Sequence, residues 1–248
     1  MFLYQPPDGY RYNSDSIFLY DFIAQYPLRG QVLDVGSGVG IVGLLAARDF
    51  DVKMTIIDKQ QNMIDYAIHN YAINGLEVKA RAGDFGDFDP KERYDCILSN
   101  PPFYHPDVDQ SSDLSLNVAR YAHHLPIKTL IAGVKRLLKP RGYFLFCYDA
   151  KQIDAVLAEL RLAKLNPEQI RFVHPKADRE AKIALIAARA NSRAMLKVLP
   201  PLIVFDQQSR YLPDAQTAFD RAAAYNISAV GLALADHERE NKDNHGNI

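Results

Sequence analysis

Long apolar runs are absent from this sequence of 248 residues, because no uninterrupted apolar stretch reaches 18 residues, the length from which a membrane-spanning helix is read. The first residues, MFLYQPPDGYRYNSDS, contain no basic segment followed by an apolar stretch, which is the pattern of a secretory signal. We therefore expect a cytoplasmic protein without a membrane span.

Cysteine is scarce. Cys96 and Cys147 each lie inside an apolar, strand-like run, so we expect two separate core thiols and neither a disulfide nor a metal pair. His123 and His124 are adjacent, point in different directions from a helix start and have no cysteine nearby. We therefore expect no metal site.

Neither sign of charge is in excess overall, since the formal net charge is −1. Residues 135–210, however, carry fifteen Lys and Arg against seven Asp and Glu, whereas residues 31–134 carry nine against fourteen. This asymmetry favours a basic face that binds a polyanion such as RNA. The alternative is a solvated surface that happens to be basic. We expect charge reversal among Arg171, Lys176, Arg179 and Lys182 to weaken RNA binding.

Apolar residues make up 48% of the chain, enough for a full core. Strand patterns alternate with helical ones along most of its length, which predicts an α/β fold with a doubly wound, mostly parallel sheet. The predicted strands are 31–35, 52–58, 76–84, 94–100 and 143–148, and the predicted helices are 41–49, 60–75, 126–142 and 151–165. No helix separates the last strands, 169–174 and 181–189, so we expect them to form an antiparallel edge hairpin.

No internal repeat or long linker divides the chain. We expect one catalytic domain over residues 31–205, preceded by a segment, 1–30, that covers substrate or cofactor. Residues 206–248 are expected to form a C-terminal extension. Its last part, 236–248, is polar and is expected to be a disordered tail.

A glycine loop, DVGSGVG, follows the first predicted strand and precedes a helix, the place where open α/β sheets bind ligands. Glycines let the backbone turn sharply and approach a ligand. Asp58 ends the second strand, 22 residues after Gly36, where a carboxylate can hold a ribose diol. The candidate residues for an adenosine-bearing cofactor are Asp34, Gly36, Ser37, Gly38, Gly40 and Asp58.

The loop favours S-adenosylmethionine (SAM) over a nicotinamide dinucleotide. The dinucleotide pattern G-x-G-x-x-G fails because position 41 is Ile. The charge of Asp34 suits an ammonium and a sulfonium better than a pyrophosphate. Asp84 and Phe85 end the third strand and are candidates for the adenine amine and ring face. The alternatives are a helix cap or turn for Asp84 and a glycine turn without a ligand.

The stretch SNPPF, residues 99–103, ends the fourth strand beside the glycine loop. Two prolines make such a corner stiff. The simplest alternative is that they only terminate the strand. Taken in order, DVGSGVG, IID, GDF and SNPPF resemble the class I SAM-dependent methyltransferases, which implies a seven-stranded, Rossmann-like sheet with an antiparallel edge strand.

The N-P-P-F/Y corner is similar to that of the amino-methyltransferases, which modify adenine N6, guanine N2 or a glutamine side-chain nitrogen. This resemblance implies that Asn100 and the carbonyl of Pro101 accept the two N–H groups of the target amine, and that Asn100 also contacts the cofactor. Such acceptors favour the positive charge that develops on the nitrogen. Phe103 would offer a face on which the base stacks.

More narrowly, residues 2–205 resemble the bacterial tRNA(Val) (adenine-N6)-methyltransferases, which act on the adenine just 3′ of the anticodon. The shared stretches are YRYNSDSIFL, NPPFY before a long polar loop, ARY at 119–121, and IALIAAR. The resemblance implies an RNA substrate, a tRNA, contacted by Phe103, Tyr104, Arg120 and Tyr121. The polar loop at 105–117 is a candidate lid.

Other functions stay open at this point. An rRNA guanine-N2 methyltransferase shares the corner, and a protein glutamine-N5 methyltransferase is a further alternative. A non-catalytic module that binds SAM or RNA would be favoured by a replacement at Asn100, which this chain does not have. A nicotinamide oxidoreductase is disfavoured by the glycine spacing. The sequence gives no indication of the oligomeric state.

Overall fold

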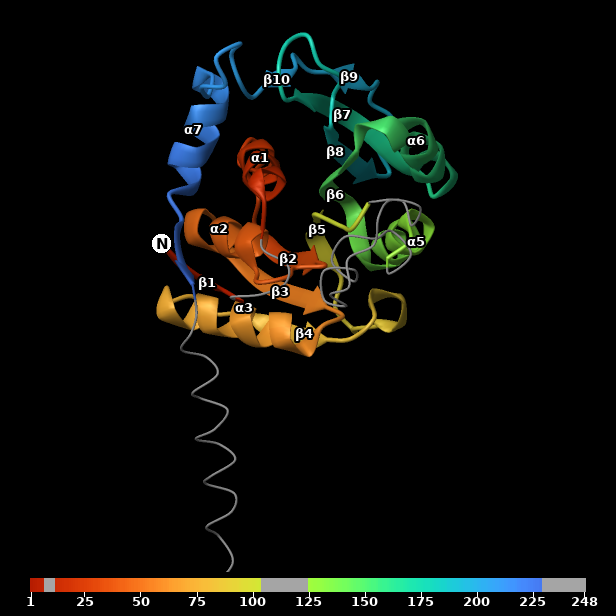
Figure 1. The fold of residues 1–248 in the computed structure, drawn as a ribbon. Coiled ribbons are helices and arrows are strands. Elements are labelled where there is room, and N and C mark those ends of the chain that lie inside the picture. The colour runs from red at the N-terminus through yellow and green to blue at the C-terminus, as the bar shows by residue number, and fades with distance from the viewer. Residues whose placement is uncertain (7–11, 104–124, 229–248) are drawn as a thin grey trace, which may run out of the picture.

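The computed structural model describes residues 1–6, 12–103 and 125–228. Its main feature is a nine-stranded sheet in the order β10-β7-β8-β6-β5-β2-β3-β4, with β9 paired to β7 (Figure 1). The strands are β2 (Gly30–Val35), β3 (Val52–Asp58), β4 (Lys79–Ala82), β5 (Tyr94–Ser99), β6 (Leu138–Asp149), β7 (Leu165–His174), β8 (Ile183–Ala190), β9 (Lys197–Val198) and β10 (Leu202–Ile203).

The predicted doubly wound α/β fold is confirmed. The strands β2, β3, β4, β5 and β6 pair in parallel, and β8 runs antiparallel to both of its neighbours. The predicted hairpin is β7–β8. Its antiparallel strand β8 lies between β6 and β7, and the short strands β9 and β10 extend the sheet beyond β7.

Helices cover both faces of the sheet. They are α1 (Ser14–Ile23), α2 (Ile41–Asp49), α3 (Gln61–Ile73), α5 (Ile127–Leu137), α6 (Ile153–Leu162) and α7 (Pro213–Ala222). From β2 the chain moves outward to β4, and then from β5 outward to β7. Right-handed crossovers therefore place α2 and α3 on one face and α5 and α6 on the other (Figure 1). The switch between the two directions lies between β2 and β5, which is where such sheets bind ligands.

The core is centred on β5 and β6. Phe144, Leu145, Phe146 and Cys147 are fully buried in succession, because a strand in the middle of a sheet covered by helices is buried on both faces. Burial of an apolar side chain of this size stabilises the fold by about 1.5–3 kcal/mol. This strand therefore gives a rigid support to the sheet edge that follows it.

Several predicted boundaries are wrong: β7 begins at Leu165, ahead of the expected 169, and the start of β6 differs most. The helix expected over 126–142 ends at Leu137, and β6 begins at Leu138. Pro140 lacks an N–H and disfavours helical backbone in the residue before it, so the helix stops ahead of Lys139. Arg141 adopts a left-handed φ of 64°, and the pairing with β5 shifts register at this point.

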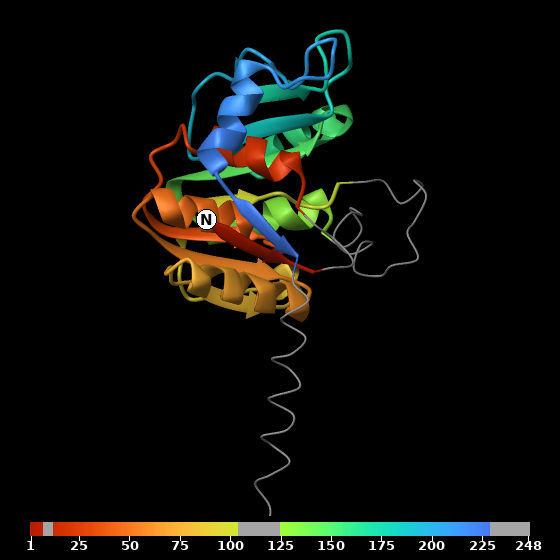
Figure 2. The same ribbon diagram turned by 60° about the vertical axis from the view of Figure 1, so that its left-hand side comes forward.

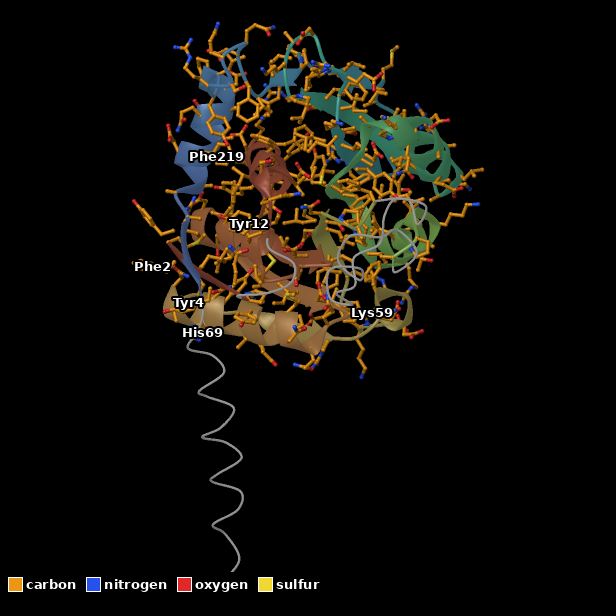
Figure 3. All side chains as sticks on the ribbon, in the orientation of Figure 1. Phe2, Tyr4, Tyr12, Lys59, His69 and Phe219 are labelled. Carbon is orange, nitrogen blue, oxygen red and sulfur yellow. The ribbon has the colours of Figure 1, made fainter. Side chains whose placement is uncertain are left out.

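Both ends of the described chain form elements that were not predicted. β1 (Phe2–Gln5) pairs in parallel with β11 (Tyr225–Ser228), and Figure 2 shows the two strands side by side. Helix α7 packs on α1. Phe219 of α7 (labelled in Figure 3) places its ring centroid 5.6 Å from that of Phe18. Residues 206–228 therefore pack against the N-terminal segment. The division of the chain at 30 and 205 stays a prediction, and 236–248 lie outside the described residues.

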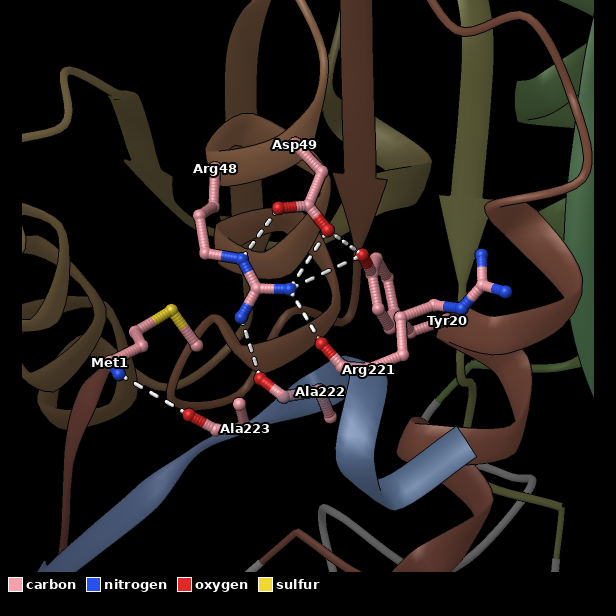
Figure 4. Close-up of polar contacts among 7 residues, drawn as sticks. All are labelled: Met1, Tyr20, Arg48, Asp49, Arg221, Ala222 and Ala223. Atoms are coloured by element: carbon pink, nitrogen blue, oxygen red, sulfur yellow. Dashed lines mark hydrogen bonds and ion pairs between the residues drawn. The ribbon is translucent and has the colours of Figure 1, made fainter. Parts of the chain in front are cut away.

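A polar clamp holds this arrangement (Figure 4). Arg48 of α2 donates to the carbonyls of Arg221 and Ala222, at 2.8 and 2.6 Å, and also pairs with Asp49. Asp49 accepts a hydrogen bond from the hydroxyl of Tyr20 in α1. The clamp therefore joins the end of α7 to α1 and α2.

Over residues 1–6, 12–103 and 125–228, no helix is long and apolar enough to cross a membrane. Within the same ranges, no group of three or more His, Cys, Asp or Glu side chains is placed to hold a metal ion. Cys96 and Cys147 are free and buried, as predicted.

Candidate active site

A pocket opens at the carboxyl edge of β2, β3 and β5. It receives residues from the glycine loop, from the end of β3, from the start of the 3₁₀ helix η1 (Phe85–Asp87) and from the Asn-Pro-Pro corner. All of the predicted cofactor residues except Gly40 line it: Asp34, Gly36, Ser37, Gly38, Asp58, Asp84, Phe85 and Asn100. Gly40 instead precedes α2, where an added Cβ would lie 3.1 Å from that of Ala67.

The glycine loop leaves its backbone open to the pocket. Gly36 and Gly38 have φ values of 68° and 53°, which L side chains rarely adopt, and no atom lies within 4 Å of a Cβ placed on either. The amides of Gly36 and Ser37 both donate to the carbonyl of Ile57, at 2.9 and 3.1 Å. The Ser37 hydroxyl is buried and has no hydrogen-bond partner within the described part of the chain. A polar ligand group in the pocket would satisfy it.

Asp58 is held by two backbone amides. Its carboxylate oxygens accept from Gly38 N at 2.8 Å and from Gln60 N at 2.9 Å. Each oxygen keeps a further lone pair, so the carboxylate can still accept from two neighbouring hydroxyls. Burial raises the pKa of Asp58, and the backbone amides of Gln60, Gly38 and Lys59 oppose that rise. The residue at the end of β3 is therefore oriented before any ligand arrives.

Asp34 lies deeper in the pocket. Its side chain is 1% exposed, and Oδ2 accepts from Gly43 N at 2.9 Å. Burial raises the pKa of Asp34 to about 7; the Gly43 amide opposes this rise, and the nearby charge of Asp58 adds to it. A cation in the pocket would favour the ionised form of Asp34.

Asp84 serves two purposes. Oδ1 accepts from Gly86 N at 2.9 Å and so caps η1, while Oδ2 pairs with Lys59 (labelled in Figure 3) at 3.2 Å. The Gly86 amide is the main cause of its lowered pKa. The cap that local sequence allowed is therefore present, and Asp84 also lines the pocket. The buried ring of Phe85 lies beside it, wedged against Gly133 of α5.

These residues fit SAM. Asp34, Asp58 and Asp84 bring three carboxylates to one pocket, which suits a cofactor with an ammonium and a sulfonium and opposes a pyrophosphate. The apolar walls from Ile57, Met63 and Phe85 suit an adenine ring. The unpartnered Ser37 hydroxyl and the open glycine backbone leave polar groups that can bind the other polar atoms of SAM.

The Asn-Pro-Pro corner lies at the edge of this pocket, where Asn100 and Pro102 line it. Asn100 Nδ2 donates to Ser16 Oγ at 2.9 Å, and Asn100 Oδ1 accepts from the thiol of Cys147 at 2.8 Å. The preceding residue, Ser99, donates its hydroxyl to the carbonyl of Val35 in β2 at 2.8 Å. The corner is therefore fixed by side chains as well as by its prolines.

Two predicted catalytic residues are less accessible. Pro101 is buried. Phe103 is 9% exposed, with its ring centroid 5.8 Å from that of Tyr148, and its carbonyl accepts from Gln152 Nε2 at 2.9 Å. Neither residue lines the pocket. The stacking role of Phe103 stays a prediction.

Several predicted residues fall outside the described ranges. These are Tyr104, Arg120, Tyr121, the loop 105–117 and the pair His123 and His124. The structure adds pocket residues that sequence reasoning did not assign: Tyr12, Ser16, Lys59 and Leu125. Tyr12 and Ser16 belong to the stretch YRYNSDSIFL. The family resemblance included this stretch but assigned no role to either residue.

The chain matches known proteins in sequence. The methyltransferase small domain family matches residues 13–152. A tRNA1(Val) (adenine(37)-N6)-methyltransferase from Phocaeicola vulgatus is 26% identical over 158 residues, 63% of this chain and 67% of the relative. The enzyme of the same description from Flavobacterium johnsoniae is 23% identical over 215 residues, 85% and 91% of the two chains.

Solved structures share the fold. One is described as a predicted O-methyltransferase from Agrobacterium tumefaciens; it superposes with a TM-score of 0.66 at 18% identity, over 87% of this chain and all of the other. A methyltransferase from Pyrococcus furiosus gives 0.58 at 18% identity, over 76% and 88%. The family match covers more than half of the chain and the fold agrees with it. The chain belongs to the methyltransferase small domain family and is a class I SAM-dependent methyltransferase.

Proposed function

We propose that this enzyme methylates the exocyclic amine of a nucleobase, adenine N6 in a tRNA anticodon loop. The observation that carries the proposal is the position of Asn100, which presents a side-chain amide at the edge of the cofactor pocket from a corner stiffened by two prolines. The relatives described as tRNA1(Val) (adenine(37)-N6)-methyltransferases support the choice of adenine and of tRNA.

Different pocket residues would bind different parts of the cofactor. Asp58 would hold the ribose hydroxyls, and Asp84 with Phe85 would hold the adenine. Asp34 would face the positively charged part, and the open backbone of Gly36 and Gly38 would contact the remainder. When bound, SAM supplies an electrophilic methyl group on a sulfonium.

Asn100 and Pro101 would activate the target amine. The lone pair of an exocyclic amine is delocalised into the ring, which makes the nitrogen a weak nucleophile. Hydrogen bonds from its two N–H groups to Asn100 Oδ1 and to the Pro101 carbonyl would favour tetrahedral geometry and the positive charge that develops on the nitrogen. The alkylated nitrogen then loses a proton readily, so a strong general base is not needed.

RNA would approach along the tip of the β7–β8 hairpin. β7 runs parallel to β6, so this tip lies on the same edge of the sheet as the pocket. Arg179 and Lys182 are exposed there, and neither forms an ion pair with another described residue. Arg171 differs, because it pairs with Asp214 at 3.0 Å and donates to the Pro200 carbonyl. Of the four cations predicted to bind phosphates, Arg179 and Lys182 are the best placed.

The test is methylation of unmodified tRNA from the same organism in the presence of SAM, followed by mass spectrometry of the nucleosides. N6-methyladenosine is the expected product. Methylguanosine would instead favour the guanine-N2 activity, which shares the Asn-Pro-Pro-Phe corner. If tRNA acquires no methyl group, the tRNA assignment is wrong, and ribosomal RNA and then protein glutamine become the substrates to test.

Asn100→Ala provides the matching variant. It should lower the rate of methyl transfer by about 10²–10³, the cost of removing one preorganised polar group from a reacting centre. SAM affinity, measured by calorimetry, should stay within about twofold, because the remaining pocket residues are unchanged. Equal turnover in the variant and the wild type would remove Asn100 from the mechanism.

A further inference from the structure

We propose that Ser16 and Cys147 are positioning residues that fix which way the Asn100 amide points. The inference rests on the proposed function, in which Asn100 Oδ1 accepts a proton of the target amine. It assigns a role to a hydroxyl from the first turn of α1 and to a thiol from β6, both outside the Asn-Pro-Pro corner itself.

The geometry gives each end of the amide one partner. Ser16 Oγ is 2.9 Å from Nδ2, and Cys147 Sγ is 2.8 Å from Oδ1. Ser16 is 2% exposed and Cys147 is fully buried. Both contacts therefore lie away from bulk water, which would otherwise compete for the amide.

The orientation matters because the two ends of an amide differ chemically. Oxygen accepts hydrogen bonds and NH₂ only donates them, so a flipped Asn100 would present donors to a target amine that also donates. The terminal torsion of asparagine is broad and roughly two-fold, so the backbone corner alone does not choose between the two orientations. Two prolines fix the position of the amide but not its flip.

The Cys147 thiol favours one of the two orientations of the Asn100 amide. Burial raises the pKa of the Cys147 thiol well above its ordinary value, so it stays protonated and donates to Oδ1. In the opposite orientation Nδ2 would face sulfur, a weak acceptor, and one N–H would be poorly satisfied. Ser16 accepts from Nδ2 in the observed orientation. Oδ1 has two lone pairs, and the second stays available for the target amine.

The experiment compares Cys147→Ala, which removes the donor, with Cys147→Ser, which keeps one. Cys147→Ala should lower kcat about tenfold, the loss expected from one hydrogen bond, while the KM for RNA and the Kd for SAM stay within about twofold. Cys147→Ser should restore kcat to within about threefold of wild type. Ser16→Ala and Ser16→Thr form the corresponding pair for the other end of the amide.

Cys96→Ala is the matched control. Cys96 is also a buried thiol, and it lies in the neighbouring strand β5, paired in register with Tyr143 of β6. The side-chain hydrogen bonds of Asn100 go to Ser16 and Cys147, whereas the Cys96 thiol lies 3.9 Å from the Ile97 carbonyl. Its truncation should lower the melting temperature about as much as Cys147→Ala and leave kcat unchanged. Should Cys147→Ala fail to fold, Cys147→Val fills the space without a donor and makes the same comparison.

A second readout separates positioning from general packing. In an Asn100→Ala background, Cys147→Ala should have no further effect on single-turnover methyl transfer, because the group that it positions is gone. An additive loss in the double variant would overturn this inference and leave the proposed function standing. Equal kcat in Cys147→Ala and wild type would do the same. A wild-type protein that binds SAM but methylates no RNA removes the proposed function, and this inference with it.

Discussion

At the scale of single residues, folding changes the charge that Asp34 carries between pH 4 and pH 7. Its pKa is about 7 in the folded protein against 3.8 for an unperturbed group. The folded state therefore binds this proton more tightly between these values, and the free energy of unfolding should fall as pH rises from about 4 to 7. Asp34→Asn should remove this contribution, since the amide has no proton to lose.

The measurement is urea unfolding of the cofactor-free protein at pH 5 and pH 8. The wild type should lose more stability over this interval than Asp34→Asn does. SAM should bind the wild type more tightly at the higher pH, when Asp34 is ionised, and the variant should show little of this dependence. Parallel pH profiles for the two proteins would show that Asp34 does not titrate in this range.

Asp58 is the second carboxylate with a prediction of its own. Asp58→Ala removes two acceptors that the backbone amides of Gly38 and Gln60 hold in place. The loss of hydrogen bonds to a charged group should weaken SAM binding by about 10- to 100-fold. Calorimetry gives the affinity directly. Unchanged affinity would reject the assignment of Asp58 to the ribose.

The sequence predicted those pocket residues that can be identified from a local sequence pattern. The glycine loop, Asp58 and Asn100 all reach the pocket, because each follows directly from a parallel strand whose carboxyl end lies on one edge. Ser16 and Cys147 could not be found in this way. They are 84 and 47 residues from Asn100 in sequence, and only tertiary packing brings them to its amide.

At the scale of elements, the contact between α5 and η1 controls the wall of the pocket. Gly133 of α5 faces Phe85, and an added Cβ would lie 2.5 Å from the ring. Gly133→Ala should destabilise the fold by about 1–3 kcal/mol through overpacking. The higher helix propensity of Ala offsets about 1 kcal/mol of this cost, so we expect a net loss of stability. It should also weaken SAM binding, because Phe85 lines the pocket.

Phe85→Leu combined with Gly133→Ala tests the cause. The smaller side chain makes room for the new methyl group, so the double variant should unfold at a higher urea concentration than Gly133→Ala alone. A Gly133→Ala protein as stable as the wild type would mean that Phe85 can move aside without cost. Calorimetry on the same two proteins reports the effect on the cofactor.

Element boundaries were predicted less well than element types. The helix before β6 was expected to continue to 142, although Pro140 already disfavours helix at Lys139, and α5 ends at Leu137. Helices α1 and α7 were not predicted. Helix α7 is held mainly by α1, through Phe18 and Phe219, and by the Arg48 clamp, whereas α1 also packs on α2, β6 and β8. A contact between residues 18 and 219 leaves no local signal in either segment.

At the scale of the whole molecule, the two edges of the sheet should differ in their effect on RNA binding. Charge reversal of Arg179 and Lys182, on the edge that holds the pocket, should weaken RNA binding at least about tenfold. It should lower the slope of log Kd against log salt by about 1.5, because two phosphate contacts are lost. Filter binding or fluorescence anisotropy at several salt concentrations measures both.

Arg193 and Lys197 are the matched control. Both are exposed and lie away from the β7–β8 tip: Arg193 follows the end of β8 on the opposite edge of the sheet, and Lys197 opens β9, beside Gln169 in the middle of β7. Their reversal changes the net charge by the same amount and should have a much smaller effect on both quantities. Equal losses from the two pairs would mean that RNA responds to overall charge and does not contact the β7–β8 tip.

The pairing of β1 with β11 has a consequence for biosynthesis. Phe2 is synthesised well before its partner Tyr225, which is among the last of the described residues to be made. At about 5–20 residues per second, roughly 10–45 s separate the two. Until then α1 lacks α7 and the Arg48 clamp, although it can already pack on α2, β6 and β8. The glycine loop can form early on the ribosome, whereas the packing of α1, which carries Ser16, is completed only near the end of translation.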